Sequence, residues 1–109
     1  MHEFKWSKTE KKIARAAFEK AYQRECSDII EKIRIKAKEI SEPDNIWRFH
    51  DFLTEKRHEI DEKYDYRYSK LILVFARLIN EGWINFSDFE GLAEDKIDRI
   101  KFLTNLWTE

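Results

Sequence analysis

The chain has 109 residues, enough for a single domain with one modest core. Its 21 Lys and Arg against 22 Asp and Glu give a formal net charge of -1, and this balance argues against a nucleic-acid binder, which needs surplus cations to neutralise phosphate. Hydrophobic residues make up 42% of the chain, which excludes the disordered class, and 2 Gly and 1 Pro are too few for the turns of a β-sandwich or barrel. We therefore expect an all-α fold.

The sequence shows no pattern for export or for membrane insertion. Its longest apolar run, residues 71–76, falls short of the roughly 18 residues that a membrane helix needs. The first residues lack the apolar centre of a signal peptide. A single cysteine, Cys26, cannot form an internal disulfide, so a packing role is expected for it. We therefore expect a cytoplasmic protein with no membrane span and no cofactor.

The first predicted helix covers residues 7–40. Ser7 and Glu10 have the spacing of a capping box. Behind them apolar residues recur every three or four positions, with no Gly or Pro before Pro43: Ala14, Phe18, Tyr22, Cys26, Ile33, Ala37 and Ile40. Such a helix is about 50 Å long, whereas a globular chain of this size has a radius of gyration of only about 13 Å. The helix must therefore extend beyond any globular body.

A second long helix is predicted after a turn at Pro43. Asp44 or Asn45 is the candidate N-cap, and the helix is expected to start at residues 46–47. Nothing before residue 80 must break it, so we expect one helix that ends at Gly82, a residue suited to a left-handed C-cap. Its inward stripe would consist of Phe49, Phe52 or Leu53, Lys56, Ile60 and Tyr64. Two long helices joined by a short turn predict an antiparallel hairpin, a stalk over about residues 7–64.

The rest of the chain predicts a small helical head, about residues 65–107, within the same single domain, 1–109. Residues 63–68 with their three tyrosines indicate either a contact surface or packing where stalk and head join. Ser87 and Glu90 have capping-box spacing, with Gly91 closing the turn. A last amphipathic helix is marked by Ile97, Ile100, Leu103, Leu106 and Trp107. Because a two-helix stalk leaves apolar surface uncovered, we expect a symmetric homodimer.

Metal binding and catalysis are both disfavoured. Glu55 and His58 have the Glu-x-x-His spacing of di-iron bundles, but such a site needs the motif twice and two further Glu. One Cys and three His provide no zinc ligand set, and phosphate loops, nucleophile elbows and the HExxH motif are missing. His58 with Asp61 or Glu62 could exchange protons, although such a pair on a charged helix is usually a solvated surface pair. We expect a protein that is not an enzyme and holds no metal.

The most informative feature is the polar face of the second helix. Seven residues at three- and four-residue spacing share it: Trp47, His50, Asp51, Thr54, Arg57, His58 and Asp61. Trp and Arg are enriched at the energetic centres of protein interfaces. The face therefore predicts a protein-binding surface. In the alternative interpretation, Trp47 packs into a dimer interface and Asp51 pairs with cations of the first helix.

At these residues the sequence resembles the fluorescence recovery protein family of cyanobacterial photoprotection. The matching stretches lie within about residues 18–96. They are Trp47 and residues 20–25, 50–53, 56–61, 63–67, 74–76 and 81–82. The resemblance implies an all-α homodimer with a stalk and a head. It also implies a regulator that binds the C-terminal domain of the light-activated, red orange carotenoid protein and speeds its return to the orange form. That return ends quenching of phycobilisome fluorescence.

The resemblance also implies an interaction surface, made of Trp47, His50, Asp51 and Arg57. Trp47 would be the apolar anchor and Arg57 a fork for carboxylates, while Asp51 would orient Arg57 or pair with the partner. Candidate residues for the dimer interface are Ile46, Phe49 and Leu53. In the head, Leu73 stands where cyanobacterial members carry Phe. Because the family extends to bacteria without phycobilisomes, a dimeric helical adaptor with another partner is the alternative function.

Overall fold

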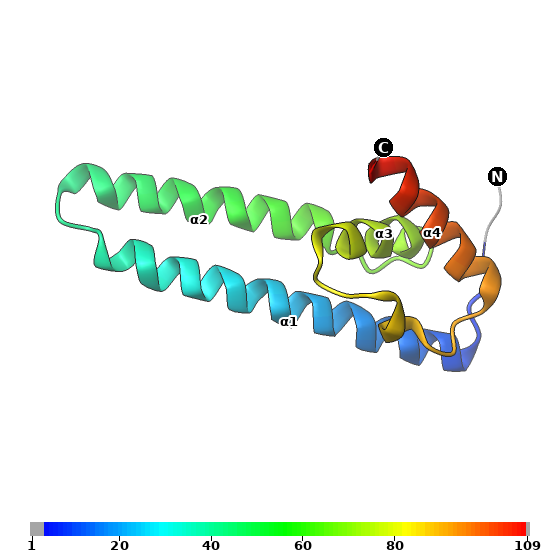
Figure 1. Ribbon diagram of the computed structural model, residues 1–109. Helices are drawn as coiled ribbons and strands as arrows, with labels where there is room; N and C mark the ends of the chain where they lie inside the picture. Colours follow the sequence, from blue (N-terminus) through cyan, green and yellow to red (C-terminus); the bar gives the residue numbers. More distant parts are fainter. Residues whose placement is uncertain (1–3, 109) are drawn as a thin grey trace.

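The computed structural model describes residues 4–108, and over these residues the chain is helical with no strand, so the predicted all-α class is confirmed. The elements in order are α1 (Lys8–Lys38), α2 (Pro43–Lys63), α3 (Leu71–Glu81), the 3-10 helix η1 (Phe86–Phe89) and α4 (Glu94–Thr108). α1 and α2 run antiparallel as a long hairpin, and the remaining elements gather at the end of the hairpin away from its tip (Figure 1). The molecule measures 53 × 27 × 21 Å.

The first helix begins where its capping box predicts. The Ser7 hydroxyl accepts a hydrogen bond from the N–H of Glu10 at 3.1 Å, and the Glu10 carboxylate accepts one from the N–H of Ser7 at 3.0 Å. Each side chain thus satisfies one of the free amides at the helix start. α1 ends at Lys38, close to the predicted boundary at residue 40.

The second helix begins earlier than predicted. Pro43 is its first residue, a position that suits the fixed φ of proline and its missing N–H. Asn45 lies inside the first turn, where its Oδ1 accepts hydrogen bonds from the N–H groups of Ser41 and Glu42, each at 3.2 Å. Glu42 is the N-cap. The prediction of Asp44 or Asn45 as N-cap is therefore wrong. Asn45 lies within the helix, and its side chain accepts hydrogen bonds from the backbone of the residues that precede the helix.

The single helix predicted up to residue 80 is also wrong. α2 ends at Lys63, and α3 starts only at Leu71. Tyr64 leaves the helical conformation with φ -91° and ψ 71°. The rings of Tyr64 and Tyr66 pack edge-on against Phe18 of α1, with centroids 5.3 and 4.8 Å apart. Aromatic packing where stalk and head join, one of the two interpretations of residues 63–68, outweighs the helix propensity of this segment.

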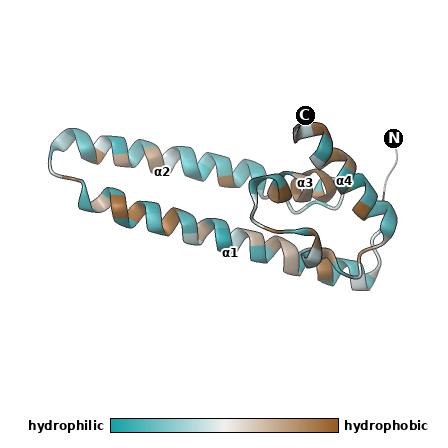
Figure 2. Ribbon diagram, in the orientation of Figure 1, coloured by the Kyte–Doolittle hydropathy of each residue, from teal (hydrophilic) through white to brown (hydrophobic). Residues whose placement is uncertain are grey.

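The core lies where the head, made of α3, η1 and α4, packs against the first half of α1. Deeply buried apolar side chains come from all four of these elements: Ala14, Ala21, Leu71, Phe75, Leu78, Phe89 and Ile100. Alanine on the buried side of α1 lets the neighbouring elements approach closely. In Figure 2, brown segments mark α1 and α3, whereas α2 is largely teal. Among the described residues, none of α2 belongs to the apolar core, and Tyr64, directly after the helix, packs against it.

Two glycines end helices in the head. Gly82 closes α3 with φ 85°, as its predicted C-cap role requires, and Gly91 follows η1 with φ 96°. Both values lie in the left-handed region that favours glycine. The cap before η1 differs from the prediction, because Asn85 rather than Ser87 provides it. The Oδ1 of Asn85 accepts the N–H of Ser87 at 3.1 Å, and Asp88 accepts the N–H of Asn85 at 3.1 Å.

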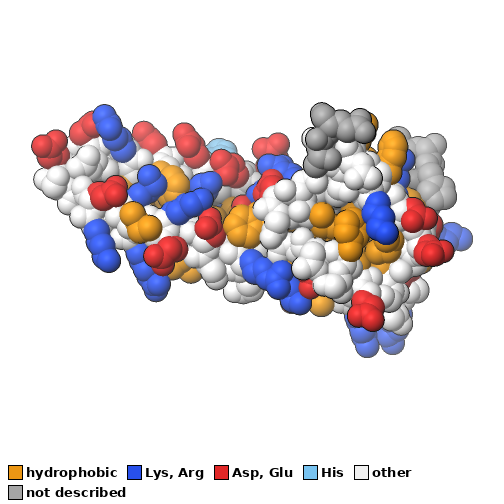
Figure 3. Space-filling model, in the orientation of Figure 1, with side chains coloured by type: hydrophobic (Ala, Val, Ile, Leu, Met, Phe, Trp, Pro, Cys, Tyr) orange, Lys and Arg blue, Asp and Glu red, His pale blue; other side chains and the backbone are white. Residues whose placement is uncertain are grey.

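Beyond the head the hairpin is open. Residues 26–62, all of them described, include no buried side chain. Several large apolar side chains there are between 39% and 49% exposed: Ile30, Ile35, Ile46 and Leu53. On the face seen in Figure 3, acidic and basic side chains alternate along the stalk, and hydrophobic ones gather over the head. The distal stalk, residues 26–62, therefore has no buried core within this chain.

Candidate functional site

The predicted contact residues lie on one helix, α2, and all are exposed: Trp47, His50, Asp51 and Arg57. Trp47 is 63% exposed, the highest value among the exposed large hydrophobic side chains of the described residues. An indole in that position has most of its apolar surface in water, which binding to another protein would remove. The face therefore has the residue types and the exposure of a protein contact surface.

Asp61 orients Arg57 in the structure. The Nε of Arg57 donates to Asp61 Oδ2 at 3.0 Å, one helical turn further along α2. Asp51 instead lies beside His50, with 3.4 Å between its Oδ1 and the imidazole Nδ1. The guanidinium side chain stays 78% exposed, so it remains accessible to a carboxylate of another protein. Of the two roles considered for Asp51, orienting Arg57 is thus taken by Asp61.

The candidate dimer residues differ in exposure. Ile46 and Leu53 are 48% and 39% exposed, whereas Phe49 is half-buried and lines a shallow pocket at the hairpin tip beside Ile40. Ile46 and Leu53 are thus the two that keep substantial apolar surface for contact with another chain.

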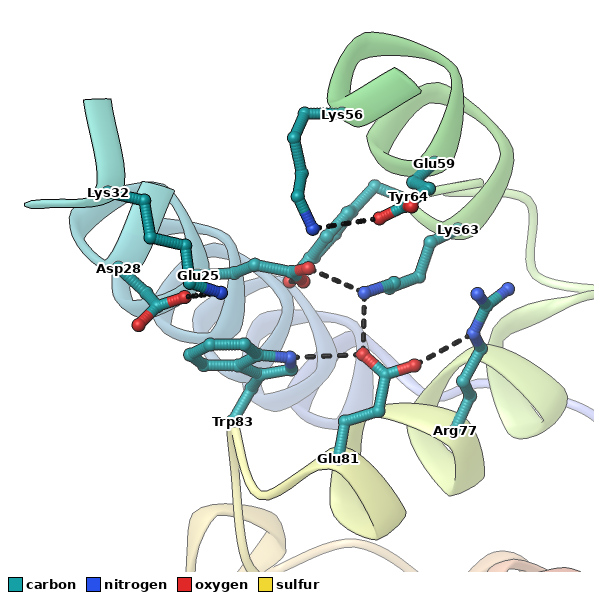
Figure 4. A network of polar contacts seen from close by, with 10 residues as sticks. All are labelled: Glu25, Asp28, Lys32, Lys56, Glu59, Lys63, Tyr64, Arg77, Glu81 and Trp83. Atoms are coloured by element: carbon teal, nitrogen blue, oxygen red, sulfur yellow. Dashed lines mark hydrogen bonds and ion pairs between the residues drawn. The ribbon is translucent and has the colours of Figure 1, made fainter. Parts of the chain in front are cut away.

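Lys63, the first residue of the predicted segment 63–68, fixes the base of α2 through a burial that the sequence pattern did not predict. It is the only buried residue of that helix. Its Nζ lies 2.6 Å from Glu25 Oε2 of α1 and 2.5 Å from Glu81 Oε1 at the end of α3 (Figure 4). The hydroxyl of Tyr64 donates to the second oxygen of Glu25 at 2.8 Å. One ammonium thus ties together three helices.

The carboxylate of Glu81 is the second centre of this network. It also accepts hydrogen bonds from Arg77 Nε and from the indole N–H of Trp83, each at 3.0 Å. Burial raises the pKa of Glu81, but the hydrogen bonds from Lys63, Arg77 and Trp83 outweigh it and lower the pKa below the usual value. Burial, followed by the hydrogen bond to Glu25, raises the pKa of Tyr64. Glu81 therefore stays ionised and the phenol of Tyr64 stays neutral, so that it can donate to Glu25.

A second buried ion pair joins the start of α1 to the start of α4. Lys96 Nζ lies 2.9 Å from Glu10 Oε2, and the N–H of Ala93 donates to the same oxygen at 3.0 Å. Burial raises the pKa of Glu10, but the backbone amides of Ser7 and Ala93 and the ammonium of Lys96 outweigh it and lower the pKa to about 2. The capping box of α1 is therefore also an anchor for α4.

The geometry also bears on the other chemistries considered for this chain. Asp61, one of the two carboxylates considered as a partner of His58, accepts a hydrogen bond from Arg57. Within residues 4–108 no three His, Cys, Asp or Glu side chains are grouped to hold a metal ion. In the same part of the chain, every helix is too short or too polar to cross a membrane.

The exposed face on α2 and the anchored head can be compared with known proteins. A family model described as photoprotection regulator fluorescence recovery protein matches residues 6–104. The chain belongs to this family. The match confirms the resemblance seen in the central residues, and the family is described as a regulator rather than as a class of enzymes.

Individual members of the family are similar over nearly the whole chain. The fluorescence recovery protein of Synechocystis sp. PCC 6803 is 46% identical over 101 residues, which is 93% of each chain. The solved structure of the Fremyella diplosiphon fluorescence recovery protein has 50% identity and a TM-score of 0.88, covering 93% of this chain and 99% of the other. The solved Synechocystis structure gives 44% identity with the same TM-score, 0.88, and the same coverage. The stalk and head are thus an arrangement shared with these relatives.

Proposed function

We propose that this chain is a non-enzymatic regulator that acts in the cytoplasm on the orange carotenoid protein. It binds the C-terminal domain of the red, photoactivated form and accelerates the return to the orange form, which ends quenching of phycobilisome fluorescence. The observation that carries the proposal is the exposed face of α2. There Trp47, which is 63% exposed, lies within about three helical turns of Arg57. Membership of a family of photoprotection regulators supports the choice of partner.

The proposed action is non-covalent. A binding protein speeds a relaxation only when it holds the transition state of that relaxation more tightly than the starting state, by about 1.4 kcal/mol for each tenfold in rate. Trp47 supplies the apolar contact, and Arg57, oriented by Asp61, supplies a planar fork for a carboxylate of the partner. His50 and Asp51 complete the polar part of the face.

We further propose that the chain forms a homodimer through the distal stalk. Residues 26–62 lack a buried side chain, and Ile46 and Leu53 keep 48% and 39% of their surface exposed. A second copy laid along this part of the hairpin would cover these side chains, together with the edge of Phe49. The hairpin would then become one half of a larger helical bundle.

The experiment is the dark recovery of purified, photoactivated orange carotenoid protein, followed by absorbance with and without the chain. Arg57→Leu is expected to reduce the acceleration by about tenfold or more, since charged hydrogen bonds at an interface contribute about 1.5–3 kcal/mol. Arg48→Leu is the matched control, because Arg48 is also an exposed arginine of α2 and pairs with Asp44 four residues earlier.

Retained acceleration by the Arg57→Leu variant, with the Arg48→Leu control equally active, would contradict the assignment of the face. Absence of any effect by the unmodified chain at large molar excess would contradict the proposed partner. That second result favours the alternative, a dimeric helical adaptor whose partner is another protein.

A further inference from the structure

A groove runs between α1 and α2 on the part of the stalk next to the head. Its floor is made of apolar and aromatic side chains from both helices: Phe18, Tyr22, Ile60 and Tyr64. The groove has a volume of about 860 Å³, within the range of clefts that hold ligands. Arg57 lines it as well, so a residue of the proposed contact face lies at the edge of this groove.

The floor of the groove is preformed. Tyr64 meets Phe18 and Tyr22 edge-on, with ring centroids 5.3 Å apart in each case. The hydroxyl of Tyr64 is fixed by Glu25, which is itself bound to Lys63 (Figure 4). Side chains that are already ordered lose little conformational entropy on binding. The network at the base of α2 therefore keeps one ring of the floor in place.

The rim of the groove carries a small excess of positive charge. Its charged side chains are Arg15, Lys20, Arg24, Arg57, Glu19 and Asp61. Glu19 and Asp61 each pair with one of these cations, and Asp88 beside the groove pairs with both Lys20 and Arg24, which leaves one more cation than anions. Arg15 stands over the ring of Tyr66, 4.2 Å from the ring centroid, and so projects from α1 at a defined position. A basic rim around an apolar floor suits a segment with an apolar side chain flanked by carboxylates.

We propose that this groove receives an acidic, apolar segment of the partner protein, so that α1 shares in recognition through Tyr22 and Arg15. The inference rests on the proposed function and takes the orange carotenoid protein as the source of the segment. Continuity through Arg57 joins the groove to the exposed face of α2. The groove is lined by residues from 15–24 and 57–64, and neither Ile46 nor Leu53, where we place the dimer interface, lines it.

The test uses the full chain and photoactivated orange carotenoid protein. It measures the chain concentration that gives half-maximal acceleration of dark recovery, and light scattering gives the molar mass of each variant. Arg15→Glu reverses a charge on the rim, and Lys12→Glu makes the same change about one turn away, outside the groove. Tyr22→Ala removes a floor ring that is 41% exposed, and Tyr68→Ala removes a ring that is 39% exposed and does not line the groove.

Arg15→Glu and Tyr22→Ala are expected to raise the half-maximal concentration by about tenfold or more. The two controls are expected to change it by less than about threefold, and all masses should equal that of the unmodified chain. Groove variants that behave like their controls overturn the inference and leave the proposed function intact. A groove variant with a lower mass than the unmodified chain assigns the groove to a second copy and also overturns it. If the unmodified chain has no effect on recovery, the proposed function fails and the inference with it.

Discussion

At the scale of single residues, the buried Lys63 has the largest structural role in α2. Its ammonium is enclosed by carboxylates from α1 and from the end of α3, and its side chain is only 4% exposed. A buried charge is tolerated only when it is paired and hydrogen-bonded, and removing one partner leaves the other without compensation. Lys63 therefore matters to stability through the carboxylates that it neutralises.

We predict that Lys63→Met lowers the free energy of unfolding by about 3–5 kcal/mol, because Glu25 is left as a buried carboxylate without its ammonium. Arg77→Met removes a different partner of the same network, one whose side chain is 45% exposed. That control should cost less than about 1 kcal/mol. Urea unfolding of both variants at one protein concentration measures the difference. Equal losses in the two variants would show that Lys63 is not the centre of the network.

The sequence could predict which side chains share one side of α2, but it could not predict the ion pairs at the base of that helix. Helical spacing placed Trp47, Arg57 and Asp61 on one side of α2, because a 3.6-residue period fixes which side chains are neighbours. The burial of Lys63 could not be predicted, because its partner Glu25 is 38 positions away in the sequence. A lysine in a charged segment is expected to be solvent-exposed unless the fold brings distant carboxylates to it.

At the scale of elements, the residues at the ends of the helices help to determine where each helix stops and how the chain turns. Gly91 and Gly82 both adopt positive φ, yet their surroundings differ. A Cβ at position 91 would lie 2.8 Å from Ile13 Cδ1 of α1, whereas a Cβ at position 82 would meet no atom within 4 Å. The turn after η1 thus depends on glycine for close approach to α1 as well as for backbone conformation.

We predict that Gly82→Ala costs about 1–2 kcal/mol of unfolding free energy, the strain of a left-handed alanine. Gly91→Ala should cost slightly more, since the Cδ1 end of the Ile13 side chain must move in addition. Thermal unfolding of the two variants gives the comparison. A smaller loss for Gly91→Ala than for Gly82→Ala would mean that the contact with Ile13 relaxes freely.

Element boundaries were predictable where they depend on local chemistry. The capping box at Ser7 and the C-cap at Gly82 involve neighbours in sequence, and both are confirmed. The end of α2 at Lys63 is different, because it is decided by the packing of Tyr64 and Tyr66 on α1. No Gly or Pro marks that break, so a local pattern continues the helix through it.

At the scale of the whole molecule, burial is concentrated at one end. The radius of gyration is 16.9 Å, against about 13 Å for a compact chain of this size. Helix length alone predicts that the long helices extend beyond a compact body. The distance between the two helices of the stalk could not be predicted. Side-chain periodicity identifies an apolar stripe on each helix, but it does not say whether the same chain or a second chain covers that stripe.

The stability of the molecule should fall in acid. Glu10 has a pKa near 4.5 when unfolded and about 2 when folded, so its contribution is complete above pH 5 or so and is lost as the pH falls from 4.5 towards 2. Burial opposes this lowering, and the bonds to Ser7, Ala93 and Lys96 cause it. Glu10→Gln should therefore flatten the decline of unfolding free energy over this range. Parallel pH profiles of the variant and the unmodified chain would contradict the role of Glu10.

Assembly should depend on the distal stalk. Ile46→Glu introduces a charge on a side chain that is 48% exposed, and we predict that it lowers the molar mass in solution to that of one chain. Arg48→Glu is the control, because Arg48 is two positions from Ile46 and residues at that spacing lie on nearly opposite sides of a helix. Light scattering over a range of protein concentrations separates the outcomes. A mass that Ile46→Glu leaves unchanged would place the dimer interface elsewhere.

The openness of the stalk has a consequence for the evolution of the family. Side chains such as Trp47 and His50 can be exchanged without creating a cavity or leaving a buried charge unpaired, so substitutions on the proposed contact face should cost little stability. Phe75 and Phe89 in the head have no such freedom, because their contacts fill the core. A lineage could thus acquire a new partner by drift along α2 while inheriting its core unchanged.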